Sequence, residues 1–147
     1  SMKEIEEVWK KIEEKNIKSV KKTALLYIRD KKILIVHKKT IDMYISPGGK
    51  NNEGENDYKC LKREIQEELN CGVKNLNYFK TFEGKAPEGF YLELKCYFGE
   101  LDGEIKLNPM DNIDGYLWID RDYDKNLKLA SILKYEIIPA LVKQEIM

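Results

Sequence analysis

The sequence predicts an α+β domain, arranged as an α/β/α sandwich with a mixed central sheet. Short β-branched, apolar runs lie on both sides of one acidic amphipathic helix, and a second amphipathic segment closes the chain. A chain of 147 residues is long enough for a single core that buries about 70% of its unfolded surface. Residues 1–147 are therefore expected to form one domain. Residues 1 and 2 are interpreted as a cloning remnant followed by the initiator methionine.

Residues 3–15 predict an N-terminal amphipathic helix. Ile5, Val8, Trp9 and Ile12 recur at helical spacing, with Lys and Glu at most other positions. We expect this apolar face to pack on the core of the domain. A contact in a homodimer is the alternative.

Six β-strands and a C-terminal helix are predicted from runs of apolar and β-branched residues. The strands cover residues 23–28, 33–36, 43–46, 76–82, 91–98 and 115–119. The first two are expected to form a hairpin around residues 29–32. The last helix covers residues 129–145, with a kink at Pro139 because proline cannot donate an intrahelical hydrogen bond.

The central helix lies within residues 49–71, where a glycine turn leads into an acidic segment. Tyr58, Leu61, Ile65 and Leu69 gather on one arc of this helix and predict a buried face. On the flank beside that arc lies a group of three carboxylates, Glu64, Glu67 and Glu68. Like charges at such spacings destabilise a helix by roughly 0.2–0.5 kcal/mol per pair. A hard divalent cation such as Mg²⁺ removes this repulsion, because it prefers carboxylate oxygens and is often shared with phosphates.

Arg63 points to the same site, since the chain has only three arginines among its 26 basic residues. A guanidinium grips a carboxylate through two hydrogen bonds, which a lysine cannot do. Its available partners are Glu67 and Glu55. Upstream, Gly48 and Gly49 follow the third strand, and glycines there let the backbone approach a phosphate or a metal ion closely.

This segment resembles the signature of the Nudix hydrolases. The matching residues are, in order, Gly49, Glu55, Arg63, Glu64, Ile65, Glu67, Glu68 and Cys71. Asn70 stands where that family has glycine, at the end of the helix, where Asn is the second choice for a left-handed residue. The resemblance implies a Nudix-type sandwich and Mg²⁺-dependent hydrolysis of a diphosphate bond, with Mn²⁺ as a substitute ion.

The resemblance also implies roles for individual residues. Glu67, Glu68 and the Gly49 carbonyl are expected to bind the metal, with Glu55 as a further candidate. Glu64 is either another ligand or the base that takes a proton from water. Residues outside the motif are alternative bases: Glu100, Glu104, Asp111 and Asp114.

The implied substrate is a nucleoside diphosphate-linked small molecule, either a nucleoside triphosphate, oxidised or not, or an ADP-ribose-like compound. Gly48, Gly49 and Tyr91 are the candidate substrate contacts, with Tyr91 placed to stack on a base. A non-catalytic Nudix-fold module that binds nucleotides or regulates another protein is the alternative. The presence of all four motif glutamates argues against that alternative.

The net charge, the apolar runs and the cysteine, histidine and lysine patterns exclude several other classes of protein. The net charge is zero, no apolar run approaches the roughly 18 residues of a membrane span, and the N-terminus begins charged, so we expect a cytoplasmic protein. Cys60, Cys71 and Cys96 lack metal-site spacing and predict reduced thiols. The single histidine, His37, gives little support to a histidine-based triad. The lysine pairs are scattered without interleaved aromatics, so no nucleic acid polymer is expected as a partner.

Overall fold

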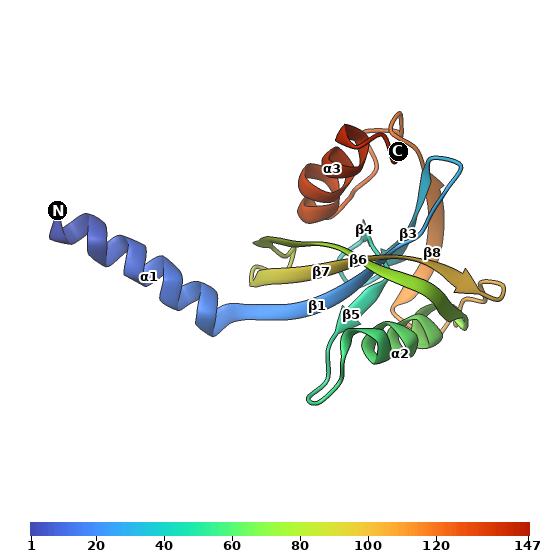
Figure 1. Cartoon of the computed structure of the whole chain (residues 1–147), viewed down its shortest axis with the longest axis horizontal. Coiled ribbons are helices and arrows are strands. Elements are labelled where there is room, and N and C mark those ends of the chain that lie inside the picture. The colour runs from blue at the N-terminus through green and yellow to red at the C-terminus, as the bar shows by residue number, and fades with distance from the viewer.

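The computed structural model describes the backbone of residues 1–147 and the side chains of residues 1–13 and 19–147. In chain order the elements are α1 (Met2–Lys18), β1 (Ser19–Leu26), β2 (Ile28–Arg29), β3 (Lys32–Lys38), β4 (Met43–Ile45), β5 (Gly48–Lys50), α2 (Asp57–Leu69), β6 (Gly72–Lys85), β7 (Tyr91–Asp102), β8 (Ile113–Ile119), the π-helix η1 (Leu133–Ile137) and α3 (Ile138–Lys143). They build an α+β fold in which α2 and α3 lie on opposite sides of the strands (Figure 1). The predicted fold class is confirmed.

Two four-stranded sheets form the middle layer. Sheet A has the order β5-β1-β7-β6 and is mixed, because β1 runs parallel to β7 and the other pairs are antiparallel. In sheet B, β3 pairs with β2 and β4 and also with β8, all antiparallel. The parallel pair joins residues 19–26 to residues 91–98, which are far apart in the sequence.

The predicted hairpin of residues 23–28 with 33–36 is wrong for most of its first strand. Residues 19–26 belong to sheet A. Within the predicted first strand, Ile28 is the residue that pairs with β3, opposite Ile33, as part of β2. The turn between β2 and β3 is tight, with Asp30 and Lys31 at φ 52° and 61°. Such left-handed turns match the twist of paired strands. Local sequence predicted this turn, whereas the partner of β1 is set by a strand seventy residues away.

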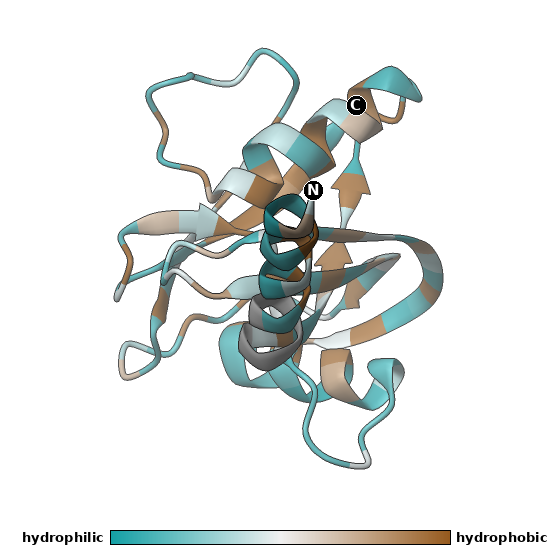
Figure 2. Cartoon of the chain, turned by 90° about the vertical axis from the view of Figure 1, so that its left-hand side faces the viewer, coloured by the Kyte–Doolittle hydropathy of each residue, from teal (hydrophilic) through white to brown (hydrophobic). Residues whose placement is uncertain are grey.

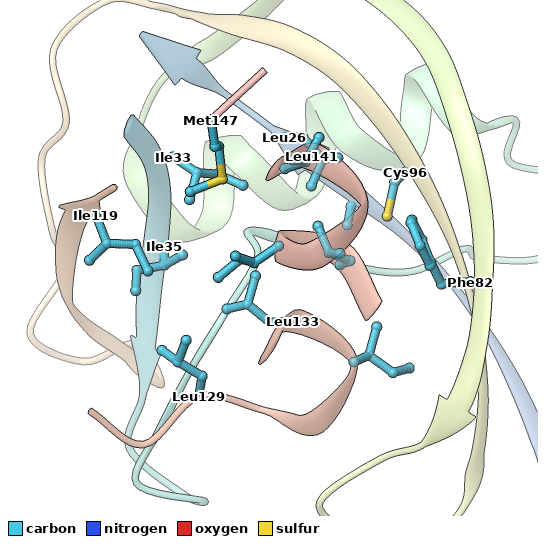
Figure 3. Close-up of a cluster of buried hydrophobic side chains, with 14 residues drawn as sticks. Leu26, Ile33, Ile35, Phe82, Cys96, Ile119, Leu129, Leu133, Leu141 and Met147 are labelled. Carbon is cyan, nitrogen blue, oxygen red and sulfur yellow. The ribbon is translucent and has the colours of Figure 1, made fainter. Parts of the chain in front are cut away.

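The core consists of two clusters, one under each helical layer. Leu26, Ile35, Leu133 and Leu141 belong to the cluster beneath η1 and α3, shown in Figure 3. The cluster beneath α2 includes Leu25 and residues from β3, β6 and β7. Successive residues of β1 point to different clusters because side chains alternate along a strand. This double coverage explains why residues 24–26 of β1 and residues 33–36 of β3 are continuous apolar runs.

The C-terminal helical segment begins at residue 131, two residues before η1 and two residues later than predicted, and its irregularity precedes Pro139. Leu129 forms an isolated bridge with Tyr44 instead of a helical turn. The N–H of Ile138 donates to the Leu133 carbonyl, five residues back, and closes η1. Because Pro139 has no N–H, the ordinary helical register cannot be completed at this point. The irregularity predicted at Pro139 therefore takes the form of a π-helical segment just before it.

Helix α1 projects away from the rest of the domain (Figure 1). Viewed from that end, hydrophobic residues colour one side of it and hydrophilic residues the other (Figure 2). Ile5, Trp9 and Ile12 are 50%, 59% and 42% exposed. The expectation that this face packs on the core is wrong for the described side chains, because α1 extends beyond the start of β1 and contacts neither core cluster. A homodimer contact stays a prediction.

Candidate active site

Helix α2 has well-defined ends and a buried face. Its N-cap residue, Asn56, accepts a hydrogen bond from the Lys59 N–H at 2.8 Å. Asn70 ends the helix in the left-handed conformation, at φ 55°, as expected from the sequence. The predicted face is correct for Leu61, Ile65 and Leu69, which are fully buried, but Tyr58 is 51% exposed. Tyr58 lies in the first turn and lines a surface groove together with Lys95 and Tyr97 of β7.

Asp57 fixes the first turn of α2 to sheet A. Its carboxylate accepts hydrogen bonds from Lys95 and Tyr97 on β7. The Asn51 side-chain amide also donates to it, at 3.0 Å. Burial acts to raise the pKa of Asp57, but these hydrogen bonds and the charge of Lys95 outweigh it. The pKa of Asp57 therefore lies below its usual value. The helix start is therefore tied both to a strand and to the loop that precedes it.

Arg63 holds the middle of α2 against the chain that enters it. Its Nε and Nη2 donate to the two carboxylate oxygens of Glu55, each at 2.8 Å. Nη2 also donates to the Lys50 carbonyl at 2.9 Å, and Nη1 donates to Glu64 at 2.8 Å. The guanidinium hydrogen bonds lower the pKa of Glu55 to about 2. Of the two partners predicted for Arg63, Glu55 is the bidentate one, while Glu67 lies 3.5 Å from Nη1.

Glu68 is a buried carboxylate that faces the strand before the helix. It is 6% exposed, and its Oε1 accepts a hydrogen bond from the Gly48 N–H at 2.9 Å. Burial, the largest cause, raises its pKa to about 8, and nearby Glu64 and Asp111 add to this. Among the side chains of residues 1–13 and 19–147, no basic group forms an ion pair with Glu68. A buried acid with carboxylates around it is costly to ionise unless a cation approaches.

Glu64 lies directly against Gly49. A Cβ built on Gly49 would lie 2.6 Å from each of the Glu64 carboxylate oxygens, so a larger residue there would have to displace the Glu64 carboxylate. At Gly48, φ is +141° and a Cβ would overlap the Thr23 carbonyl, so this position also requires glycine. Burial raises the pKa of Glu64, opposed by its contact with Arg63. The two glycines thus bring the backbone of β5 against two carboxylates of α2.

These groups face a cavity of about 300 Å³ between sheet A, α2 and the C-terminal helices. Glu64, Glu67, Glu68, Gly48 and Gly49 all line it, so the structure brings most of the predicted site together. The Glu67 side chain is 57% exposed and lies at the edge. Glu55 does not line the cavity, because Arg63 holds both of its oxygens on the outer side of the helix. That placement does not fit its expected role as a metal ligand.

Tyr91 is not among the residues that line this cavity. Its neighbours Leu92 and Leu94 do line it, and side chains alternate along β7, so Tyr91 starts on the other face of the strand. The lining found among the described residues has no aromatic side chain. Aliphatic residues such as Ile132 and Leu133 form the apolar wall instead. The expected stacking role of Tyr91 has no support in this arrangement.

The structure distinguishes among the candidate bases outside the motif. Asp111 lines the cavity, close enough to Glu68 to affect its pKa. Asp114 is bonded to His37 Nδ1 at 2.6 Å, and Glu100 accepts a hydrogen bond from Asn75. Neither these two nor Glu104 is part of the cavity lining. Of the candidate bases, Glu64 and Asp111 are therefore the ones that line the cavity.

Sequence reasoning missed four charged residues of the cavity: Lys22, Lys38, Lys50 and Glu88. Lys50 directly follows Gly49, but the other three come from β1, β3 and the turn between β6 and β7, so no local motif links them. The only available signal was that Lys22 and Lys38 lie in strands that also carry buried apolar residues. That signal is common on solvated surfaces, which is how the lysine pairs were interpreted.

The residues present fit a divalent cation shared with a ligand better than a closed metal cage. Within the part of the chain whose side chains are described, no three His, Cys, Asp or Glu residues are arranged as a ready metal site. The buried Glu68 carboxylate nevertheless forms no ion pair with any basic side chain that the structure describes, and Glu64 and Glu67 border the same cavity. Oxygen donors of this kind suit Mg²⁺ or Mn²⁺, which commonly take one or two carboxylates plus phosphate and water.

The remaining expectations concern single residues and membrane contact. All three cysteines are free and buried, and burial raises the pKa of Cys60 to about 11 and of Cys96 to about 12. His37 has a carboxylate partner at each ring nitrogen, Asp114 and Asp42, so it is a satisfied histidine outside the cavity.

Of the helices that the structure describes, none has the length and apolar character of a membrane span.

Comparison with known proteins identifies the family. The NUDIX domain model matches residues 20–141. A solved structure described as a UDP-X diphosphatase superposes with a TM-score of 0.70 at 20% identity, over 88% of this chain and 64% of that chain. A MutT NUDIX hydrolase from Burkholderia pseudomallei gives a TM-score of 0.68 at 19% identity, over 86% and 97% of the two chains.

A NUDIX hydrolase from Nitrosomonas europaea gives a TM-score of 0.64 at 15% identity, over 87% of this chain and 88% of that chain. No curated protein sequence matches this chain. Identities this low establish the fold alone, whereas the domain match covers most of the chain and includes the whole acidic helix. The chain belongs to the Nudix hydrolases, a family of pyrophosphatase-type enzymes that act on phosphoric anhydride bonds.

Proposed function

We propose that the cavity is the active site of a Mg²⁺-dependent pyrophosphohydrolase, and that its substrate is a small nucleotide-type molecule containing a diphosphate bond. The observation that carries this proposal is the buried Glu68 carboxylate. It faces the cavity beside Glu64 and Gly49, and it has no basic partner among the described side chains. A divalent cation bound there would neutralise the phosphates and make the phosphorus more susceptible to attack.

The residues of the chain would then divide the remaining work. Glu68, Glu67 and Glu64 would hold the cation, with the Gly49 carbonyl as a further oxygen donor. Arg63 keeps Glu64 in place through its 2.8 Å hydrogen bond while Glu55 anchors the guanidinium. Either Glu64 or Asp111 would accept the proton of the attacking water, since both border the cavity. Hydrolysis needs no covalent intermediate, so positioning is the main task of the protein.

The test is hydrolysis of a panel of nucleoside triphosphates, ADP-ribose, dinucleoside polyphosphates and nucleotide sugars, with Mg²⁺, with Mn²⁺ and with a chelator. One solved neighbour is described as a UDP-X diphosphatase, which is a reason to include UDP-linked compounds. We expect chelation to abolish turnover. Glu68→Gln should lower kcat on the order of 100-fold while keeping the Gly48 hydrogen bond, because the amide oxygen still accepts it.

Glu53→Gln is the matched control, since Glu53 is exposed in the loop before α2 and does not line the cavity. It should retain wild-type turnover. Turnover that survives both chelation and the Glu68→Gln change would contradict the proposal.

A further inference from the structure

Three lysines line the cavity beside the acidic groups, Lys22, Lys38 and Lys50, and the first two interact with each other. Lys22 on β1 and Lys38 on β3 both line it, together with Glu64, Glu68 and Glu88. Burial, followed by repulsion from Lys38, lowers the pKa of Lys22, so the two ammonium groups are close enough to interact. Within the described side chains, Lys22 forms no ion pair with a carboxylate. Two neighbouring cations that are partly removed from water favour the binding of an anion.

The turn between β6 and β7 covers both lysines. Glu88 on this turn contacts Lys38, with Oε2 3.4 Å from Nζ, and the Phe90 ring centroid lies 5.5 Å from Lys22 Nζ. The turn is closed by two backbone hydrogen bonds of 2.9 Å, from Gly89 to Ala86 and from Ala86 to Phe90. Glu88 is thus held where an anionic ligand of the cavity would compete with it for Lys38.

We propose that Lys22 and Lys38 form a phosphate subsite of the cavity, and that Glu88 is a built-in competitor that a substrate phosphate displaces from Lys38. The proposal rests on the proposed function in taking phosphate as the anion. The lysines come from strands β1 and β3 and the carboxylates from α2, and both sets line the same cavity, so a diphosphate bound to the cation would reach this pair. Because the Lys38–Glu88 pair is long and partly exposed, its displacement costs little.

A phosphate dianion makes stronger charge-assisted hydrogen bonds with ammonium groups than a single carboxylate does. Glu88 therefore sets a threshold: it keeps Lys38 paired in the free protein and weakens the binding of ligands with too little charge to displace it. Removing its charge should increase affinity for phosphates without changing the chemistry at α2.

The experiment measures the binding of inorganic pyrophosphate by calorimetry in the presence of a chelator, so that neither a metal ion nor turnover contributes. Glu88→Gln should tighten binding about fivefold, and Lys38→Gln and Lys22→Gln should each weaken it by a similar factor or more. Lys39→Gln is the matched control, because Lys39 is exposed next to Lys38 and does not line the cavity. Circular dichroism melts verify that each variant is folded, and Glu88→Ala provides a second way to remove the carboxylate.

Pyrophosphate affinities that are equal in wild type and all lysine variants would overturn the subsite. Unchanged or weaker binding by both Glu88 variants would overturn the competitor role of Glu88. Failure of the enzyme proposal has a different signature, since lysine-dependent binding would then persist while no compound of the nucleotide panel is hydrolysed with Mg²⁺.

Discussion

Arg63 shows how one side chain organises the site at the residue scale. It reaches Glu55, Glu64 and the Lys50 carbonyl at once, which joins the loop before α2, the helix and the end of β5. Lysine could replace its charge but not this planar set of donors. The composition already suggested as much, because arginine is rare in this lysine-rich chain.

Arg63→Lys is expected to lower kcat by about 10- to 100-fold with a smaller change in KM. The ammonium cannot hold Glu55 and Glu64 together, so Glu64 loses its fixed position beside Gly49. Steady-state kinetics on the best substrate of the panel measure the effect. Arg121→Lys is the control, since Arg121 is exposed and outside the cavity. Equal loss in both variants, or none in either, would show that Arg63 does not position the site.

His37 gives a prediction about stability and pH. Hydrogen bonds from its ring to Asp114, then Asp42, raise its pKa above the ordinary value. The protonated form is therefore favoured in the folded state, so the stabilisation is fully present below the unfolded pKa of about 6.5 and is lost as the pH rises through the folded pKa. Because both aspartates are well exposed, the contribution is limited to about 1 kcal/mol.

Urea unfolding of wild type and His37→Asn between pH 5.5 and 8.5 tests this expectation. The stability advantage of wild type should be largest at the acidic end and shrink towards the alkaline end. A difference that stays constant over the whole range would mean that His37 contributes through packing and neutral hydrogen bonds. Asp42 also pairs with Lys128 at 3.3 Å, so substituting the histidine is cleaner than substituting the aspartate.

At the scale of elements, α2 was predictable and β1 was not, for one physical reason. The periodicity of α2, its acidic flank and its Asn70 end are local properties, and all appear in the structure apart from the exposed Tyr58. The pairing of β1 with β7 is decided by long-range contacts, which the order of residues around β1 does not encode. Lys22 and Lys38 were missed for the same reason, since only the assembled sheets bring them to the cavity.

Helix α1 is the element whose packing was predicted wrongly, and its removal is informative. Deleting residues 1–13 should change Tm by less than about 2 °C, because the described apolar side chains of α1 are exposed and belong to neither core cluster. Differential scanning calorimetry of both forms measures this shift. Trp9→Lys in the full chain is the matched control and should behave in the same way.

A fall of about 5 °C or more on deletion would show that α1 packs against the domain or a second copy. A Tm that drops on dilution of the full chain, but not of the shortened form, would identify the predicted homodimer.

For the whole molecule, the acidic cavity makes stability depend on bound cations. Glu64 and Glu68 come from one face of α2 and lie close to Asp111 in the loop before β8, so their mutual repulsion opposes the packing of α2 and β8 on the sheets. An aliphatic wall formed by Ile132 and by Leu133 and Ile137 of η1 also borders this cavity. A cation that binds only this assembled arrangement stabilises the fold as a unit.

We therefore expect Mg²⁺ or Mn²⁺ to raise the Tm of the wild-type protein. At a hundred times its dissociation constant, a ligand specific for the folded state adds about 2.7 kcal/mol, which for a chain of this size corresponds to roughly 5–10 °C. Glu68→Gln should melt at a higher temperature than wild type without metal at neutral pH, because it removes a carboxyl group that ionises in the unfolded chain but is held protonated in the fold by its raised pKa. The variant should gain little when metal is added. Calorimetric melts with chelator and with a series of Mg²⁺ concentrations measure both effects. A wild-type Tm that does not change with Mg²⁺ or Mn²⁺ would show that no such cation binds in this cavity. Equal shifts in wild type and Glu68→Gln would show that the ion binds elsewhere on the protein.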